Sequence, residues 1–173
     1  MEKVLIVFAH PYHLNSKSNK ALLEEVGNNS EVTIHNLAQA YPDGKIDVAK
    51  EQELLTSFDK IILQFPTFWF NTPAILKSWF DEVFTYGWAY GPDGNALKGK
   101  KFGIVTTTGG VEDAYQKNGD KGFSIEDFLN SVIVSIKYVN ADFIGYVVLH
   151  NAMNPTEEQL SVAKKEYKQL VLG

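Results

Sequence analysis

Two hydrophobic patterns alternate along the chain. Continuous apolar runs, typical of strands buried on both faces of a parallel sheet, alternate with segments whose apolar residues recur every three or four positions, as in amphipathic helices. The expected strands are residues 4–9, 60–65, 101–105 and 143–149, together with residues 32–37, where apolar and polar residues alternate. The expected helices are a segment that ends near residue 27 and residues 47–58, 73–84, 123–139 and 157–171. This alternation predicts a three-layer α/β domain with a five-stranded parallel sheet.

The order of the strands follows from simple topological rules. Because crossovers between parallel strands are right-handed, five strands separated by helices favour the order 2-1-3-4-5. Ligands of such sheets bind beyond the carboxyl ends of the strands, between strands one and three, where the order reverses. No repeat or linker interrupts the pattern, so residues 1–173 are expected to form a single domain.

The stretch from Gln64 to Gly91 is the most unusual part of the chain. It leaves an apolar run, places three aromatic rings at residues 68–70, and enters a periodic segment with Thr72 as the expected N-cap and Pro73 as the expected first helical residue. Small polar residues are more usual in such a turn. Rings beside a strand end and a helix N-terminus suit a planar ligand with polar edges, although rings that only fill the core explain the pattern equally well.

Composition restricts the chemistry. The chain has no cysteine, which excludes disulfides, thiolate metal sites and thiol catalysis, and no other metal site is expected. A net charge of -5 argues against a nucleic-acid partner. The apolar run near the N-terminus is not a signal peptide, and no segment reaches the roughly 18 apolar residues that span a bilayer. We therefore expect a cytoplasmic enzyme or binding protein with no membrane insertion, in which redox chemistry needs a bound cofactor.

Three loops meet at the ligand edge in the predicted strand order. The loop after the first strand, residues 10–19, offers hydroxyls, an amide and a helix N-terminus suited to a phosphate. The loop after the third strand, residues 66–73, offers aromatic rings. The loop after the fourth strand, residues 106–115, pairs Gly109 and Gly110 with threonines, so that backbone N–H groups can approach the edge of a ring closely.

Each of these signals has an ordinary alternative. A Gly-Gly pair is more often a tight turn, Ser16 or Ser18 more often only caps a helix, and His10 can be a plain polar residue at a strand end. Their coincidence at one edge is the informative observation. An anionic tail and a flat heteroaromatic ring would together fill all three loops, which indicates a flavin.

The segment FPTFWFNTPAILKSWFDEVFTYGWAYG, residues 65–91, resembles the signature of the flavodoxin-like NAD(P)H:quinone oxidoreductases. That family includes DT-diaphorase and the small bacterial ancillary proteins of glutathione-gated potassium efflux systems. The resemblance spans nearly the whole chain, through the HP...S..N loop, TTGG...Y and the GxxG that follows. It implies a flavodoxin-like fold and ping-pong transfer of a hydride, two electrons at once, from NAD(P)H through the flavin to a quinone or similar acceptor. The long C-terminal extension of the mammalian enzymes is absent, which favours FMN over FAD.

The resemblance also implies roles for single residues. The flavin phosphate would be held by His10, Ser16, Lys17, Ser18 and Asn19. The isoalloxazine ring would be lined by Pro66, Thr67, Phe68, Trp69 and Phe70. The N1 and O2 edge of the ring would receive donors from Thr107, Thr108, Gly109 and Gly110. Tyr115 matches the family's active-site tyrosine, which also contacts the flavin. Where DT-diaphorase has a relay histidine this chain has Lys121, which suits charge stabilisation better than proton transfer.

Other functions and partners are also considered. The likeness to efflux ancillary proteins implies a possible role as a flavin-binding regulatory subunit of a membrane transporter, which is compatible with catalysis. A flavodoxin-type electron carrier is disfavoured because the T-x-T-G-x-T loop is absent, and a hydrolase because there is no G-x-S-x-G elbow. Members of the family are homodimers, so a homodimer is expected. The rings of Tyr86, Trp88 and Tyr90 suit either its interface or the core.

Overall fold

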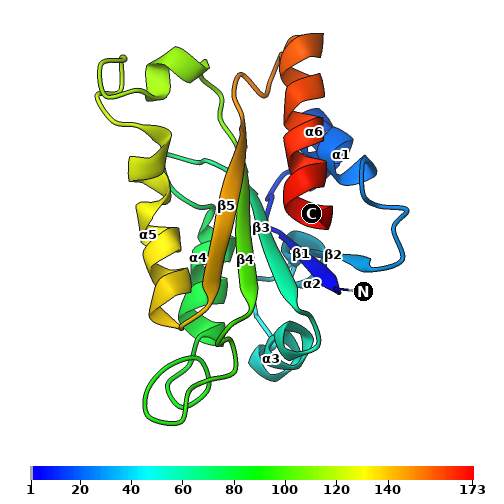
Figure 1. Cartoon of the computed structure of the whole chain (residues 1–173), viewed down its shortest axis with the longest axis vertical. Helices are drawn as coiled ribbons and strands as arrows, with labels where there is room; N and C mark the ends of the chain where they lie inside the picture. The colour runs from blue at the N-terminus through cyan, green and yellow to red at the C-terminus, as the bar shows by residue number, and fades with distance from the viewer. Residues whose placement is uncertain (1) are drawn as a thin grey trace.

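A five-stranded parallel sheet forms the middle of three layers in the computed structural model, which describes residues 2–173 (Figure 1). The strands are β1 (Val4–Phe8), β2 (Val32–Asn36), β3 (Lys60–Pro66), β4 (Lys101–Thr107) and β5 (Asp142–Leu149). Their order is β2-β1-β3-β4-β5, and every neighbouring pair is parallel. Both the sheet and its order confirm the prediction.

Helices cover both faces of the sheet. They are α1 (Lys17–Glu24), α2 (Leu37–Ala40), α3 (Val48–Thr56), α4 (Ala74–Val83), α5 (Ile125–Tyr138) and α6 (Glu157–Leu172), with the 3-10 helices η1 (His13–Asn15) and η2 (Glu112–Tyr115). The buried residues of α1 and α6 pack on one face, and those of α3, α4 and α5 pack on the other (Figure 1). None of the helices within residues 2–173 has the length and apolar character that a bilayer span requires.

Several helix ends differ from the expectation by one to three residues, and two differences concern how a helix begins. Helix α4 begins at Ala74, because Pro73 has an extended ψ of 150° and is itself the N-cap, with Thr72 outside the helix. The backbone N–H of Thr72 donates instead to Asn71 Oδ1 at 2.8 Å. Helix α2 was not expected; it begins directly after β2, where Asn36 Oδ1 accepts from the N–H of Gln39. Both differences are local, and the buried face of α4 is as expected.

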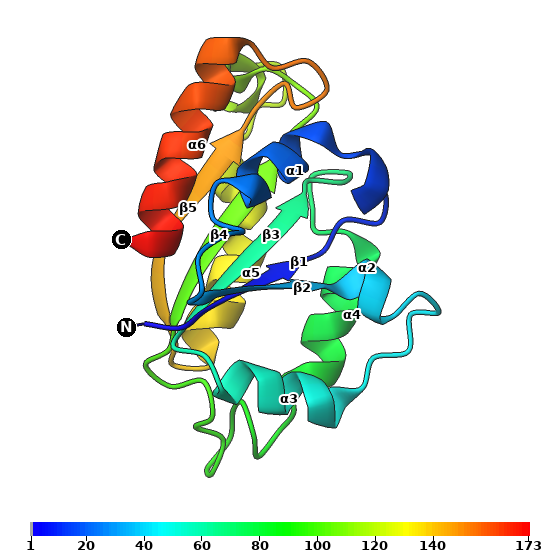
Figure 2. The same ribbon diagram turned by 90° about the vertical axis from the view of Figure 1, so that its right-hand side faces the viewer.

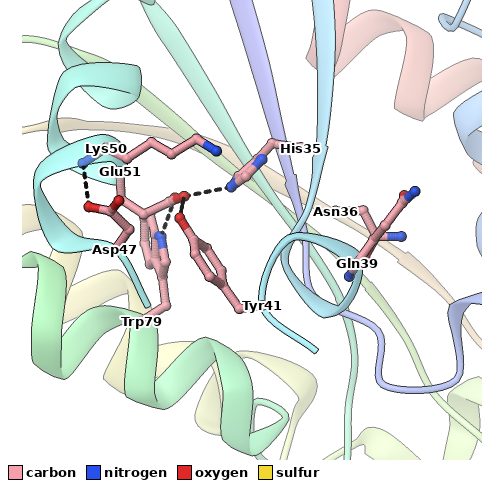
Figure 3. A network of polar contacts seen from close by, with 8 residues as sticks. All are labelled: His35, Asn36, Gln39, Tyr41, Asp47, Lys50, Glu51 and Trp79. Atoms are coloured by element: carbon pink, nitrogen blue, oxygen red, sulfur yellow. Dashed lines mark hydrogen bonds and ion pairs between the residues drawn. The ribbon is translucent and has the colours of Figure 1, made fainter. Parts of the chain in front are cut away.

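A fully buried carboxylate holds the α3 and α4 layer together (Figure 3). Glu51 of α3 accepts from Tyr41 at 2.6 Å and from Trp79 Nε1 at 2.8 Å, and it lies 2.7 Å from His35 Nε2. Burial alone raises the pKa of Glu51. The hydrogen bonds that the carboxylate accepts lower the pKa by more than burial raises it, so the net pKa lies below the ordinary value. The network joins β2, α3 and α4 and lies outside the three candidate loops.

The carboxyl ends of the strands mark one edge of the sheet. Figure 2 shows β3, β4 and β5 pointing toward this edge, which the three candidate loops also reach. The loop between α4 and β4 lies at the opposite edge, because α4 runs back along the sheet. Within that loop Tyr86 is exposed, whereas Trp88 and Tyr90 are partly buried against the core. These three rings therefore lie away from the candidate site.

Candidate functional site

The N-terminus of α1 presents backbone donors at the carboxyl edge of β1. Ser16 is the N-cap, yet its side chain caps no N–H group and instead accepts from Asn19 Nδ2 at 3.0 Å. The N–H groups of Lys17, Ser18 and Asn19 make no hydrogen bond within residues 2–173. Unpaired N–H groups, the positive end of the helix dipole and the exposed Lys17 side chain together suit a phosphate.

The side chains of Ser18 and Asn19 are buried and already bonded within the protein. Ser18 Oγ donates to the carbonyl oxygen of Ala152 at 2.6 Å, and Asn19 Nδ2 lies 3.3 Å from Thr107 Oγ1. These side chains fix α1 against β4 and the segment after β5. Any contact of these two residues with a phosphate would therefore come from their backbone N–H groups.

His10 joins the first loop to the second. Its Nδ1 accepts from the N–H of Tyr12 at 3.0 Å, so the proton of the neutral ring lies on Nε2. Burial, with a smaller effect from His13, lowers the pKa of His10 and favours this neutral form. The ring lies edge-on to Phe68, with the centroids 6.0 Å apart. His10 is thus a neutral Nε2–H donor between two of the candidate loops.

A buried chain of polar side chains supports these loops from inside the protein. Gln64 is completely buried in β3; its Nε2 donates to Asn19 Oδ1 at 3.1 Å, and its Oε1 accepts from Tyr167 at 2.9 Å. The chain continues from Asn19 to Ser16 and Thr107. It links α6, β3, α1 and β4, so that the first loop and the end of β4 are held in one fixed arrangement.

The loop after β3 is a strained two-residue turn. The N–H of Phe68 donates to the Asn71 carbonyl at 2.9 Å, and the N–H of Asn71 donates to the Phe68 carbonyl at 3.0 Å. Trp69 and Phe70 occupy the centre with φ of 48° and 61°, the pattern of a type I′ turn that normally takes Asn or Gly. Bulky residues cost about 1–3 kcal/mol each in this conformation. The turn leaves the Trp69 side chain 93% exposed.

The loops after β3 and β4 continue the sheet's hydrogen bonding. The buried Pro66 ends β3, after which the N–H of Thr67 donates to Thr107 O at 2.8 Å; the N–H of Thr108 then donates to Leu149 O at 3.1 Å. The threonines at 107 and 108 are both buried. Beyond them, Gly109 and Gly110 reach the surface, and neither N–H group has a partner within residues 2–173. The sheet thus delivers two free donors to this edge.

Tyr115 and Lys121 complete the set of predicted residues. Tyr115 is buried at the end of η2, with its ring centroid 6.0 Å from Phe128 and 5.3 Å from His150. Lys121 is exposed, and its Nζ lies 5.7 Å from the centroid of Phe70, which suits a cation–π contact. Phe70 in turn lies 5.2 Å from Phe128. Phe128 of α5 therefore connects the second and third loops.

Three residues of this edge have no assigned role in the sequence analysis. Gln64 interrupts the apolar run that follows Lys60 in β3, and that contrast is a usable signal. Phe128 lies on the periodic face of a helix and cannot be told from a core residue. His150 is the first residue after β5, and its position at a strand end is the same signal that marked His10. Burial lowers the pKa of His150, and Glu112 partly opposes that effect.

The residues present fit a flavin mononucleotide. Unpaired N–H groups at the start of α1 match a phosphate, and those of Gly109 and Gly110 match the carbonyl and nitrogen acceptors of a heteroaromatic edge. The exposed ring of Trp69 offers a flat apolar surface beside them. Lys17 and Lys121 add positive charge where the ligand would be anionic.

Comparison with known proteins supports the same interpretation. A family model described as flavodoxin-like fold matches residues 2–171. The chain is 37% identical to the glutathione-regulated potassium-efflux system ancillary protein KefF of Enterobacter sp. (strain 638), covering 98% of this chain and 95% of that protein.

Two solved structures are similar over almost their full length. General stress protein 14 of Treponema denticola in complex with FMN has a TM-score of 0.87 and 37% identity, covering 97% of this chain and 95% of that chain. The NADPH-quinone reductase of P. pentosaceus has a TM-score of 0.90 and 29% identity, covering 99% and 98%. With the observed sheet order and the match over residues 2–171, these likenesses establish that the chain belongs to the flavodoxin-like fold family.

Proposed function

We propose that this protein is an FMN-dependent NAD(P)H:quinone oxidoreductase. The observation that carries the proposal is the meeting, at one edge of the sheet, of the unpaired N–H groups of α1 and of Gly109 and Gly110 with the exposed ring of Trp69. The similar structures support it, since one holds FMN and another is named an NADPH-quinone reductase. Bound FMN would supply hydride chemistry, accepting two electrons from NAD(P)H and passing them to the acceptor in a ping-pong cycle.

The residues of the first loop bind and orient in this proposal. The N–H groups of Lys17, Ser18 and Asn19, together with Ser16 and the Nε2–H of His10, hold the phosphate. Because the side chain of Asn19 is locked by the buried polar chain through Gln64, the helix end is fixed before any ligand arrives. A fixed site loses little entropy on binding.

The second and third loops hold the ring. Phe68, Trp69 and Phe70, with Pro66 and Thr67 before them, present an apolar wall that excludes water from one side. The free N–H groups of Gly109 and Gly110 are placed to donate to the polar edge where negative charge develops on reduction. The N–H groups of Thr107 and Thr108 are used within the sheet, so donation to the ring edge is left to Gly109 and Gly110. Tyr115 and Lys121 border the acceptor's place, where the ammonium group stabilises negative charge.

Absorbance and rapid mixing test the proposal. The purified protein, or protein reconstituted with FMN, should show the spectrum of oxidised flavin and bleach on mixing with NADH or NADPH. A quinone added afterwards should restore the oxidised spectrum. A colourless protein that takes up neither FMN nor FAD and consumes no NAD(P)H would overturn the assignment. FAD uptake in preference to FMN would correct the cofactor while retaining the reaction.

A regulatory role beside catalysis is favoured by one finding, the 37% identity to an efflux ancillary protein along 98% of this chain. In that role, a membrane transporter would sense whether the flavin site is occupied. Co-purification of a tagged copy with an efflux transporter from the native membrane tests it, with an apoprotein variant as the control. Retention only of the flavin-loaded form is the expected result, and no retention of either form would contradict the role.

The assembly proposed here is a homodimer. On the outer face of α5, Val134 and Tyr138 expose more than half of their surfaces, and Phe123 does so just before the helix. Exposed apolar side chains gathered on one helix suit a partner surface of the same kind. Light scattering after gel filtration distinguishes a dimer from a monomer, and Tyr138→Lys should shift the population toward the monomer.

A further inference from the structure

His150 contacts the third loop at two points. Its Nδ1 lies 2.8 Å from Thr108 Oγ1, and its ring lies 5.3 Å from that of Tyr115, with 35° between the planes. Thr108 and Tyr115 are both buried and both belong to the candidate site. His150 itself comes from a different element, directly after β5. The fifth strand therefore contributes a side chain to a site otherwise built after β1, β3 and β4.

The direction of the hydrogen bonds can be assigned. Thr108 Oγ1 also lies 3.0 Å from the carbonyl oxygen of Gly110, which can only accept. A hydroxyl has one proton, so when Thr108 donates to Gly110, it must accept from His150. The proton of the neutral imidazole then lies on Nδ1. A directed chain runs from His150 Nδ1–H through Thr108 to the peptide of Gly110.

Backbone bonds reinforce this connection. The N–H of Asn151 donates to the same Gly110 carbonyl at 2.8 Å, and the N–H of Ala152 donates to Thr108 O at 2.9 Å. Asn151 has a φ of 53°, a conformation that Asn tolerates better than most residues. The segment 150–152 thus fixes the orientation of the Gly110 carbonyl, and with it the peptide plane that follows.

The surroundings of the ring decide how it responds to protons. Glu112 and Tyr115 face it from η2, and Glu126 of α5 and Glu158 of α6 line the same hollow along β5. Burial lowers the pKa of His150, and the Glu112 carboxylate raises it by a smaller amount. The neutral form therefore dominates at neutral pH. A proton added at lower pH goes to Nε2, which leaves the Nδ1–H bond to Thr108 intact.

We propose that His150 is a positioning residue of the flavin site, which orients the Gly109-Gly110 loop through Thr108 and holds the ring of Tyr115 in place. The inference rests on the proposed function for the identity of the ligand. The hydrogen-bond chain itself is formed by protein groups alone and does not depend on the proposed function. His150 acts through Thr108 and Tyr115 and need not touch the flavin.

The first test uses the flavin-free protein. Long-range ¹H–¹⁵N correlation spectra report which imidazole nitrogen carries the proton, and the signals of His150 are identified by their loss in His150→Asn. The expected result at neutral pH is a protonated Nδ1. A protonated Nε2 would mean that Thr108 donates to the ring, and would overturn the inference whatever the ligand is.

The second test measures the dissociation constant of FMN by quenching of flavin fluorescence. His150→Phe keeps an aromatic ring beside Tyr115 but removes the donor, and should weaken binding at least tenfold. His150→Asn keeps an N–H donor for Thr108 and should recover most of the affinity. Should His150→Phe fail to fold, Thr108→Val breaks the chain with His150 intact, and Thr108→Ser is its rescue. Thermal unfolding of each variant checks the fold.

The outcomes separate the two proposals. Affinities of His150→Phe and Thr108→Val within twofold of the parent would overturn the role of His150 and leave the proposed function standing. A parent protein that binds neither FMN nor FAD would overturn the proposed function, while the proton position on His150 would still decide whether His150 donates to Thr108. Weak binding by His150→Phe with recovery in His150→Asn supports both.

Discussion

Gly110 lies directly against the ring of Tyr115. A Cβ at position 110 would stand 3.1 Å from Tyr115 Cε2 and 3.5 Å from its hydroxyl oxygen, whereas a Cβ at Gly109 would meet no atom within 4 Å. Neither glycine has a positive φ, so alanine strains the backbone at neither position. The two neighbouring glycines therefore offer a matched pair of substitutions, one facing the protein and the other facing open space.

Gly109→Ala should leave stability within about 0.5 kcal/mol of the parent, the usual range for a surface change. It should nevertheless weaken FMN binding, because its methyl group would stand where the ring edge is proposed to lie. Gly110→Ala should displace Tyr115 by a few tenths of an ångström and affect both stability and turnover. Thermal unfolding and FMN titration measure the two effects. Undiminished FMN affinity in Gly109→Ala would place the ring elsewhere.

Trp69→Asn should stabilise the protein or leave its stability unchanged while impairing its function. Asn adopts the positive φ of 48° at low cost, so about 1 kcal/mol or more of strain is released, and almost no buried surface is lost because the Trp69 side chain is 93% exposed. The free energy of unfolding in urea and the Michaelis constants for NAD(P)H and quinone are the measurements.

Met153→Asn is the control for this substitution. Its side chain is 90% exposed, but its φ is not positive, so the same replacement should release no strain there. A loss of stability in Trp69→Asn greater than in the control would show that the ring packs against the protein. An unchanged set of Michaelis constants would remove Trp69 from the site.

Lys17→Ala should weaken the binding of FMN but not that of riboflavin, which lacks the phosphate. Lys17 is exposed on the first turn of α1, so its contribution is limited to about 1 kcal/mol, or roughly twofold to fivefold in affinity, and should decline with salt. Lys20→Ala removes an exposed lysine from the same helix, one turn further along, and is the matched control. Equal losses for both flavins would contradict a phosphate contact.

Glu51→Gln should destabilise the protein by about 1–3 kcal/mol at neutral pH, because a neutral amide cannot accept from all three donors around it. The folded-state pKa of Glu51 is lowered by these hydrogen bonds despite its burial. Its contribution is therefore present above the unfolded pKa of about 4.3 and is lost as the pH falls through the folded pKa.

The gap in unfolding free energy between the parent and Glu51→Gln should thus shrink as the pH drops below about 4.3. Urea unfolding at a series of pH values measures it. Glu53→Gln, an exposed carboxylate on the same helix, should show only a small gap at every pH. A gap that stays constant with pH would mean that folding does not shift the pKa of Glu51, and a gap that widens as the pH falls would mean that folding raises it.

The layers and the strand order were predictable because burial dictates them. Strands such as β1 and β3 are buried along their whole length, and only Lys60 and Gln64 of β3 interrupt the apolar pattern expected of such strands. The edge that carries the candidate loops followed from topology alone. The start of α4 was misplaced by one residue because Pro73 suits both the N-cap and the first helical position, and only its ψ angle decides between them.

The inner support of the site was not predictable in the same way. A hydrogen bond between Gln64 and Tyr167 joins residues 103 positions apart, and no local pattern records such a partner. The positive φ angles of Trp69 and Phe70 run against the preferences of both residues, so local propensity predicts another conformation. Sites are where tertiary structure most often overrides such preferences.

The hydrogen bond from Ser18 to Ala152 joins residues 134 positions apart, and this separation determines when the bond can form during synthesis of the chain. A ribosome makes the chain from its N-terminus, so α1 emerges long before the residue that anchors it. The proposed phosphate end of the site therefore closes only after β5 has been made. Cofactor capture then follows the folding of the sheet, and a nascent chain stalled before residue 152 should hold no flavin however much is supplied.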